Sequence, residues 1–196
     1  DYSQVELRVF AHYSKDPAFQ EAFQRGEDIH ARTASELMGV SAEGVTAPMR
    51  RIAKAINFGI IYGMGPQKLS EELGIDSQTA RNYISAYYAR YQGVAQYREE
   101  MIASAREKGY VTTLFNRRRY LPDIQHKNRV IRGEAERMAI NTPIQGTAAD
   151  LIKKAMVRIH GRLLEEGFGT RMLLQVHDEL VFEVPEPEID RVSALV

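Results

Sequence analysis

Residues 48–62 read PMRRIAKAINFGIIY and predict the clearest helix of the chain. Pro48 takes a tolerated first-turn position, and Gly63 follows where a C-terminal cap is expected. The face that the helical period predicts to be buried carries Ile52, Ala53, Ile56 and Ile60. We therefore expect an amphipathic helix that packs one side on a core and leaves the other side open to a ligand.

The open side of this helix carries a stripe of side chains spaced by four: Arg50, Lys54, Phe58 and Tyr62. For any one of these residues, a solvated basic face or an aromatic packed on a neighbouring helix is the commoner explanation. Two cations and two rings in register favour a nucleotide, because Arg and Lys bind phosphate and aromatic rings stack on bases.

Residues 171–184, RMLLQVHDELVFEV, predict a buried β-hairpin with a very tight turn at His177 and Asp178. Such a hairpin would bring Asp178 and Glu179 to one edge, where adjacent carboxylates repel and need a cation. Hard oxygen ligands favour Mg²⁺ or Mn²⁺. An acid pair alone is a weak signal, because polar turns often carry one. Asp1 ends a short predicted strand, and periodicity leaves open whether it meets Asp178 across the sheet.

The rest of the chain reads as mostly helical. Ser3 and Glu6 have capping-box spacing at the start of a first helix. Further helical patterns cover parts of 15–47, then 66–73, 77–108, 128–166 with a kink at Pro143 and Gly146, and a last helix from near Glu186. Residues 110–122 predict a second hairpin with Asn116 in its turn. A small, non-sequential sheet among helices predicts an α+β fold rather than a doubly wound one.

Composition excludes several functions. The chain has 196 residues and no Cys, which rules out disulfide scaffolds, Cys-ligated zinc and thiol catalysis. No apolar run approaches the roughly 18 residues of a membrane span, so we expect no membrane partner. The 26 basic and 26 acidic residues balance, so binding to nucleic acid would need local basic patches. Neither end resembles a natural terminus, and we expect a piece of a longer polypeptide.

Local basic patches do occur. Arg117, Arg118 and Arg119 form a run, and further cations recur at Lys127, Arg129, Arg132 and Arg137. Asn141 and Gln145 follow one and two turns after Arg137 on the same helical face. A solvated charged face explains such runs equally well. Alternatively, Asn and Gln beside Arg can bond to sugars, phosphates or base edges.

Taken together, these stretches resemble the family A DNA polymerases. DYSQVELRVFAH resembles that family's motif A, RRIAKAINFGIIYG its motif B and QVHDEL its motif C. GEDIHARTA, RRRYLPDI and ERMAINTPIQGTAADLIKKAM also resemble family sequence. The resemblance covers essentially the whole chain, in family order.

The resemblance implies a template-directed DNA polymerase. Such an enzyme adds deoxynucleotides to a primer 3′-hydroxyl by two-metal-ion phosphoryl transfer and releases pyrophosphate. Asp1 and Asp178 would hold two Mg²⁺ ions, for which Mn²⁺ can substitute, and the backbone carbonyl of Tyr2 would be a further metal ligand. Glu179 would support the metal site, and Lys54 would protonate the leaving pyrophosphate.

The resemblance also implies roles for the remaining site residues. The nucleotide-binding set would be Tyr2, Gln4, Glu6, His30, Arg50, Lys54, Phe58 and Tyr62. Arg50, Lys54 and His30 would hold the triphosphate, whereas Glu6 would exclude ribonucleotides by crowding the sugar 2′ position. Phe58 would pack on the incoming sugar and base, with Tyr62 beside the templating base. The DNA-binding set would be Arg132, Arg137, Asn141, Gln145 and His177.

In the terms of that family, residues 1–14 and 126–196 would belong to the palm. Residues 15–125, including the nucleotide-binding helix 48–62, would form the fingers. Nothing in this chain corresponds to a thumb or exonuclease domain, so we expect the isolated fragment to be inactive. Its partners would be primer–template DNA, deoxynucleoside triphosphates and the remainder of its own polymerase chain. We expect a monomer in the cytoplasm, either in a bacterial nucleoid or in the host of a phage.

Three alternatives remain at this stage. A single-subunit RNA polymerase has similar motifs, but Glu6 and Phe58 favour deoxyribonucleotides. A metal-dependent phosphohydrolase would use His30, His177 and Asp178, yet it leaves the stripe on helix 48–62 unexplained. A DNA-binding fragment without activity is the third.

Overall fold

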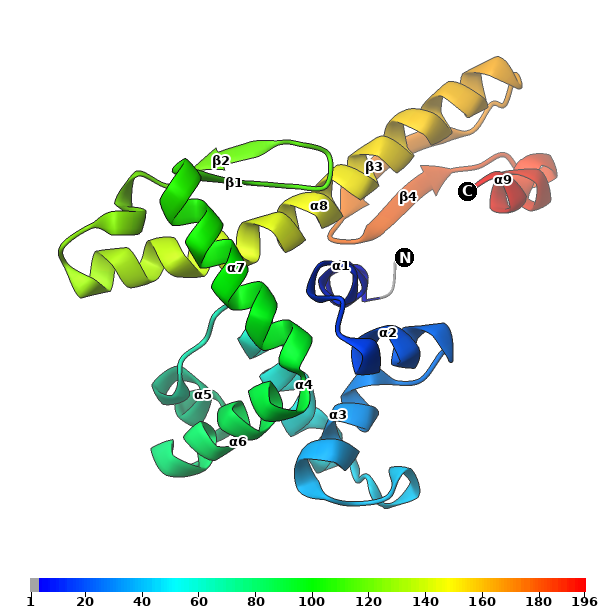
Figure 1. Cartoon of the computed structure of the whole chain (residues 1–196). Coiled ribbons are helices and arrows are strands. Elements are labelled where there is room, and N and C mark those ends of the chain that lie inside the picture. Colours follow the sequence, from blue (N-terminus) through cyan, green and yellow to red (C-terminus); the bar gives the residue numbers. More distant parts are fainter. Residues whose placement is uncertain (1–3) are drawn as a thin grey trace.

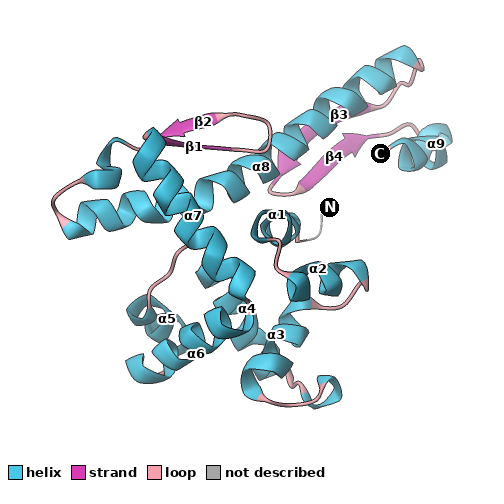
Figure 2. Cartoon of the chain, viewed as in Figure 1, coloured by secondary structure: helices cyan, strands magenta, loops and turns pink. Residues whose placement is uncertain are grey.

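The computed structural model describes residues 4–196 and has an α+β fold in which helices predominate (Figures 1 and 2). The helices are α1 (Val5–Ser14), α2 (Pro17–Gln24), α3 (Ile29–Met38), α4 (Ala47–Ile61), α5 (Pro66–Leu73), α6 (Ser77–Arg90), α7 (Gln92–Lys108), α8 (Arg129–Glu165) and α9 (Ile189–Leu195). Short 3₁₀ turns cover Ala42–Gly44, Pro122–Gln125 and Glu186–Glu188. The predicted strand at Asp1 and Tyr2 lies outside the described residues.

Two antiparallel hairpins supply the strands. β1 (Tyr110–Thr112) pairs with β2 (Arg118–Tyr120), and β3 (Arg171–Val176) pairs with β4 (Glu179–Glu183). Both tight turns use a non-glycine residue with positive φ, which is 62° at Asn116 and 51° at His177. The turn positions predicted from sequence are confirmed in both hairpins.

Local capping signals explain where several helices begin. Thr46 accepts a hydrogen bond from the Met49 amide at the start of α4, and Gly63, with φ of 64°, follows its last turn. Helices α2, α3, α6 and α8 begin after side chains that accept bonds from first-turn amides, namely Asp16, Asp28, Asp76 and Asn128. The helices predicted over 48–62 and 66–73 are therefore confirmed, the first to within one residue at each end.

The helix predicted over 77–108 is wrong in one respect, because it is divided at Tyr91. The backbone leaves the helical region there, with φ of −107° and ψ of 74°. The Tyr91 ring lies 4.8 Å from that of Phe19 and 4.7 Å from that of Tyr87, centroid to centroid, and all three are buried. Packing of these rings in the core accompanies the break, which no proline marks, although Gly93 follows two residues later.

The long helix α8 continues through Pro143 and Gly146, where a kink was expected. Figure 1 shows its two halves running in different directions, as a proline within a helix favours. A Cβ atom at Gly146 would lie 2.6 Å from Cγ2 of Thr113. Gly146 therefore allows the β1–β2 loop to approach α8 closely.

The first helix begins one residue later than the capping box predicted. Gln4 takes the N-cap position in a left-handed conformation, with φ of 58°. Glu6 accepts a hydrogen bond from the Tyr62 hydroxyl at the end of α4. The Glu6 side chain therefore links two helices.

The main core lies among helices α1 to α8 and contains Phe10, Phe19, Ile29, Ile56, Ile61, Tyr87 and Tyr91. The expectation that Ile52, Ala53, Ile56 and Ile60 form the buried side of α4 is confirmed for the last three, whereas Ile52 is partly exposed. A smaller cluster joins Ile159 and Leu163 of α8 to Val192 of α9.

The β3–β4 hairpin is more exposed than predicted. Met172, Leu180 and Phe182 pack against the cluster formed by α8 and α9. Leu173 and Leu174 are 55% and 50% exposed. Within residues 4–196, helices cover only part of this two-stranded sheet, so its apolar flanks do not imply complete burial.

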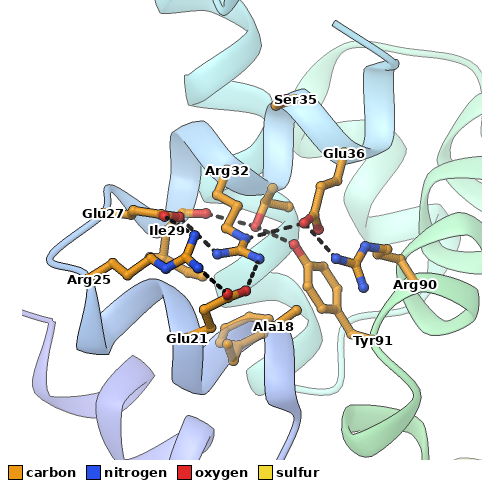
Figure 3. Close-up of polar contacts among 12 residues, drawn as sticks. Ala18, Glu21, Arg25, Glu27, Ile29, Arg32, Ser35, Glu36, Arg90 and Tyr91 are labelled. Atoms are coloured by element: carbon orange, nitrogen blue, oxygen red, sulfur yellow. Dashed lines mark hydrogen bonds and ion pairs between the residues drawn. The ribbon is translucent and has the colours of Figure 1, made fainter. Parts of the chain in front are cut away.

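An ion-pair cluster ties α2, α3 and α6 together (Figure 3). Arg32 on α3 bonds to Glu21 at 2.8 Å, to Glu27 at 2.9 Å and to Glu36 at 3.2 Å. Arg90 at the end of α6 bonds to the same Glu36 carboxylate at 2.7 Å. Although burial opposes the charge, the three carboxylates raise the pKa of Arg32 above its usual value. The cluster fixes the helix that begins at Ile29 and carries His30.

Candidate active site

A cavity of about 490 Å³ lies where α1, α3, α4, α8 and the β3–β4 turn meet. Most of its polar and aromatic lining was predicted from sequence: Gln4, Glu6, His30, Arg50, Lys54, Phe58, Gln145, His177 and Asp178. Gln175 and the apolar side chains of Val5, Leu7, Ala148, Ala149 and Ile152 complete the lining. The tertiary fold therefore gathers residues that are far apart in the chain.

Cations from α4 form one part of this lining. Nε of Arg50 donates to Oδ2 of Asp28 at 2.6 Å, and Lys54 follows one turn later. Asp28 also caps α3, because its Oδ1 accepts from the amides of His30 at 2.9 Å and Ala31 at 3.1 Å. Burial would raise the pKa of Asp28, but these hydrogen bonds and Arg50 lower it. One carboxylate thus positions both Arg50 and the helix of His30.

Asp28 was missed by the sequence reasoning, although a signal was present. An acidic residue directly before the first turn of a helix matches the N-cap preference. Its ion pair with Arg50, 22 residues later, depends on tertiary packing.

His30 is buried beside the cavity, with its ring 5.8 Å from that of Phe58. Its Nδ1 lies 3.0 Å from Nδ2 of Asn57. Burial lowers the pKa of His30 to about 4, and the charges of Arg50 and Lys54 act in the same direction. The Asp28 carboxylate opposes this effect. His30 is therefore neutral at physiological pH.

The two aromatic residues of the stripe stack on each other. The rings of Phe58 and Tyr62 are nearly parallel, at 21°, and their centroids are 6.1 Å apart. The Tyr62 hydroxyl donates to Oε2 of Glu6 at 2.7 Å. Burial, together with the Glu6 carboxylate, raises the pKa of Tyr62 to about 12, whereas a hydrogen bond with Gln145 acts in the opposite direction. Tyr62 supports Glu6, which lines the cavity.

The β3–β4 turn contributes His177 and Asp178 to the cavity. Nε2 of Gln175 donates to the His177 carbonyl at 2.6 Å, which bridges the turn. Glu179 begins β4 as an exposed residue and is not part of the lining. Asp1 and Tyr2, predicted as metal ligands, lie outside the described residues. Within residues 4–196, no three His, Asp or Glu side chains lie close enough together to hold a metal ion.

The predicted DNA-binding residues fall in separate places along α8 and, for His177, in the β3–β4 turn. Gln145 and His177 line the cavity described above. Arg137 lines a neighbouring cavity of about 470 Å³ beside the end of α4, and Asn141 lies against the Ile61 carbonyl. Arg132 lies nearer the start of α8, where its Nη1 donates to the His126 carbonyl at 3.1 Å.

The basic run in the β1–β2 hairpin is partly structural. Arg117 forms an ion pair of 2.7 Å with the buried carboxylate of Asp150. The Arg118 guanidinium lies 4.9 Å from the centroid of the Tyr110 ring, and Arg119 donates to Thr142 at 3.3 Å.

The described part of the chain contains no helix that is both long and apolar enough to cross a membrane.

Comparisons with known proteins identify the family of this chain. The family model for DNA polymerase family A matches residues 1–196. The chain is 54% identical to DNA polymerase I of Geobacillus stearothermophilus over 196 residues, and 53% identical to the thermostable DNA polymerase I of Thermus thermophilus over 195 residues. A solved structure described as the POL domain of Pol1 from M. smegmatis, in complex with DNA primer-template and dNTP, superposes with a TM-score of 0.95 at 43% identity.

These matches cover the whole chain but only part of each relative. The chain spans 22% of the Geobacillus protein, 23% of the Thermus protein and 34% of the solved M. smegmatis chain. The family resemblance and the α+β fold expected from the motifs are confirmed. This chain belongs to DNA polymerase family A.

Proposed function

We propose that this chain forms the nucleotide-binding and catalytic part of a template-directed DNA polymerase. One observation carries the proposal: a single cavity is lined by Arg50 and Lys54 from α4 and by Asp178 from the β3–β4 turn. Cations suited to a triphosphate therefore share a cavity with a carboxylate suited to a metal ion. The M. smegmatis relative, solved with DNA primer-template and dNTP, supports this function.

In the proposed reaction, the primer 3′-oxygen bonds to the α-phosphorus of a deoxynucleoside triphosphate while the bond to pyrophosphate breaks. Arg50, Lys54 and His30 hold the triphosphate, and Lys54 donates a proton to the leaving pyrophosphate. Phe58 packs on the incoming sugar and base. Tyr62 lies beside the templating base and holds Glu6, which excludes ribonucleotides from the sugar site.

The donor chemistry of the described lining suits a divalent cation, because Asp178 offers a hard carboxylate oxygen to the cavity. We propose that Asp1, the Tyr2 carbonyl and Asp178 hold two Mg²⁺ ions, with Glu179 in support and Mn²⁺ able to substitute. When bound, such ions supply Lewis-acid chemistry that activates the hydroxyl and neutralises the leaving group.

We further propose that Gln145 and His177 contact the primer or template beside the cavity, while Arg137, Asn141 and Arg132 bind DNA farther along α8. In this assignment, residues 1–14 and 126–196 belong to the palm and residues 15–125 to the fingers. The chain acts in the cytoplasm as part of a longer monomeric polymerase. Alone it would be inactive, since it spans about a fifth of its relatives' length.

A graft polymerase tests the proposal. In it, residues 1–196 replace the matching segment of the Geobacillus stearothermophilus DNA polymerase I. We expect primer extension with Mg²⁺, and its loss in the same graft carrying Asp178→Ala. A folded graft that binds primer–template but never extends it would favour the alternative of a DNA-binding fragment without activity. Ribonucleotide use that Glu6→Ala leaves unchanged would favour the RNA polymerase-like alternative.

A further inference from the structure

Asn57 on α4 is fully buried and was not singled out by the sequence motifs. Its Oδ1 accepts hydrogen bonds from the hydroxyls of Tyr87 at 2.9 Å and of Thr33 at 3.2 Å. Its Nδ2 lies 3.1 Å from Oγ1 of Thr33 and 3.0 Å from Nδ1 of His30. The carboxamide therefore joins α3, α4 and α6 directly behind a residue that lines the cavity.

The structure places the amide oxygen of Asn57 toward the Tyr87 hydroxyl, which donates to it, and the amide nitrogen toward His30. Since an amide nitrogen can only donate, Nδ1 of His30 must accept and carries no proton. The proton of a neutral His30 then resides on Nε2. A charged His30 would bring two donors head to head, in a place where burial already disfavours charge.

We propose that Asn57 is a positioning residue that holds His30 in the neutral Nε2–H tautomer, so that His30 offers an uncharged hydrogen-bond donor to a nucleotide phosphate. The inference rests on the proposed function, which assigns the phosphate contact to His30. Because Asn57 occupies Nδ1, Nε2 is the ring nitrogen left for a ligand in the cavity.

The charged groups around His30 are consistent with a neutral donor. Arg50 and Lys54 approach from α4 and disfavour a third positive charge, whereas Asp28, at the start of α3, favours it. Burial is the largest influence on the ring and opposes the charge. His30 thus adds direction to a phosphate site whose positive charge comes from Arg50 and Lys54.

Asn57→Asp in the graft polymerase tests this role with little change of shape. A carboxylate can still accept from the Tyr87 and Thr33 hydroxyls, but it also draws a proton onto Nδ1 of His30. At pH 9 the His30 Nε2 would then face the phosphate with a lone pair. We expect the dNTP KM, relative to the parent at the same pH, to rise about tenfold with little change in kcat, as for loss of one hydrogen bond to a charged group. The ratio of the KM of Asn57→Asp to that of the parent should fall toward one at pH 6.5, where the His30 ring of the variant gains a second proton.

Two matched variants separate positioning from a purely structural role. Tyr87→Phe removes a hydroxyl from the same network but leaves the Thr33 hydroxyl to donate to Oδ1 of Asn57 and so to keep the contact between Asn57 and His30. Its KM ratio should therefore not vary with pH. His30→Gln supplies a neutral donor without tautomers, and in that background Asn57→Asp should no longer cause a pH-dependent penalty. A penalty that is equal at every pH, or that persists with His30→Gln, would overturn the inference.

A direct readout does not require activity. The ¹⁵N chemical shifts of the His30 ring, assigned by their loss in His30→Gln, should show an unprotonated Nδ1 and a protonated Nε2 in the unsubstituted graft. The opposite tautomer or a charged ring at pH 7.5 would refute the inference, even if every variant extended primers. An inactive graft with the expected tautomer would refute the proposed function and leave the role of Asn57 standing.

Discussion

Replacing Tyr62 with Phe removes one hydroxyl and keeps the ring that stacks on Phe58. The lost bond joins the Tyr62 hydroxyl to Oε2 of Glu6 at 2.7 Å, across the junction of α4 and α1. A hydrogen bond to a charged group is worth about 1.5–3 kcal/mol, and the partial exposure of Glu6 reduces this to about 1–1.5 kcal/mol. Without the bond, the Glu6 side chain is free to leave the position where it would crowd a 2′-hydroxyl.

The expected result is a loss of sugar discrimination of about five- to tenfold, since each 1.4 kcal/mol corresponds to about a factor of ten. The assay is single-nucleotide primer extension by the graft polymerase. It compares kcat/KM for a ribonucleotide with kcat/KM for the matching deoxynucleotide. Glu6→Ala sets the upper limit of the loss, because it removes the carboxylate altogether.

A double-mutant cycle decides whether the hydroxyl acts through Glu6. If it does, Tyr62→Phe should have no further effect on discrimination in the Glu6→Ala background. Unchanged discrimination in Tyr62→Phe, alongside a large loss in Glu6→Ala, would refute the reasoning. The same conclusion would follow if the two losses were additive. Thermal unfolding of each variant checks that the graft remains folded.

Three further predictions follow from individual contacts. Gly93→Ala should destabilise the graft by about 2–4 kcal/mol, because a Cβ would lie 2.7 Å from the Ser14 carbonyl oxygen and 2.8 Å from Cα of Asp16. Urea-dependent proteolysis measures this loss of stability. A loss near zero would mean that α7 does not pack against the α1–α2 junction in this way. The pKa of His30 is lower in the folded state, about 4, than its ordinary value of 6.5, so the unfolded chain binds the proton more readily. The free energy of unfolding should therefore be unaffected by His30 above pH 6.5 and should decline by about 3 kcal/mol as the pH falls to 4. His30→Gln should remove this decline. Phe58→Tyr should increase dideoxynucleotide termination in sequencing-type extension assays, because the phenol can replace the interaction of the missing sugar hydroxyl; unchanged termination would place Phe58 away from the sugar.

Local signals in the sequence were sufficient for the elements that carry the site. The spacing of Arg50, Lys54 and Phe58, with Pro48 in the first turn and Gly63 after the last, predicted the side of α4 that lines the cavity. The turn at His177 and Asp178 was equally local, since apolar strand patterns flank a polar pair. Nucleotide chemistry could be inferred because cations and rings recurred with the period of the helix.

Features set by distant contacts were missed or misjudged. The break at Tyr91 lies where rings from distant parts of the chain meet in the core, and no proline marks it. The apolar runs of β3 and β4 suggested complete burial, yet periodicity cannot tell how many neighbours cover a sheet. Asn57 was not singled out, because its partners on α3 and α6 are far from it in the sequence.

The sequence by itself determined most of the helices, the two hairpin turns and the membership of DNA polymerase family A, because capping, periodicity and motif order can be read along the chain. Only the tertiary structure decided that Arg50 pairs with Asp28, that the Tyr62 hydroxyl bonds to Glu6 and that Asn57 contacts Nδ1 of His30. Each of these contacts joins residues on different helices, at separations of 22, 56 and 27 positions. Hydrogen bonds have strict limits of distance and direction, which a residue pattern does not encode and which the packing of the core alone imposes.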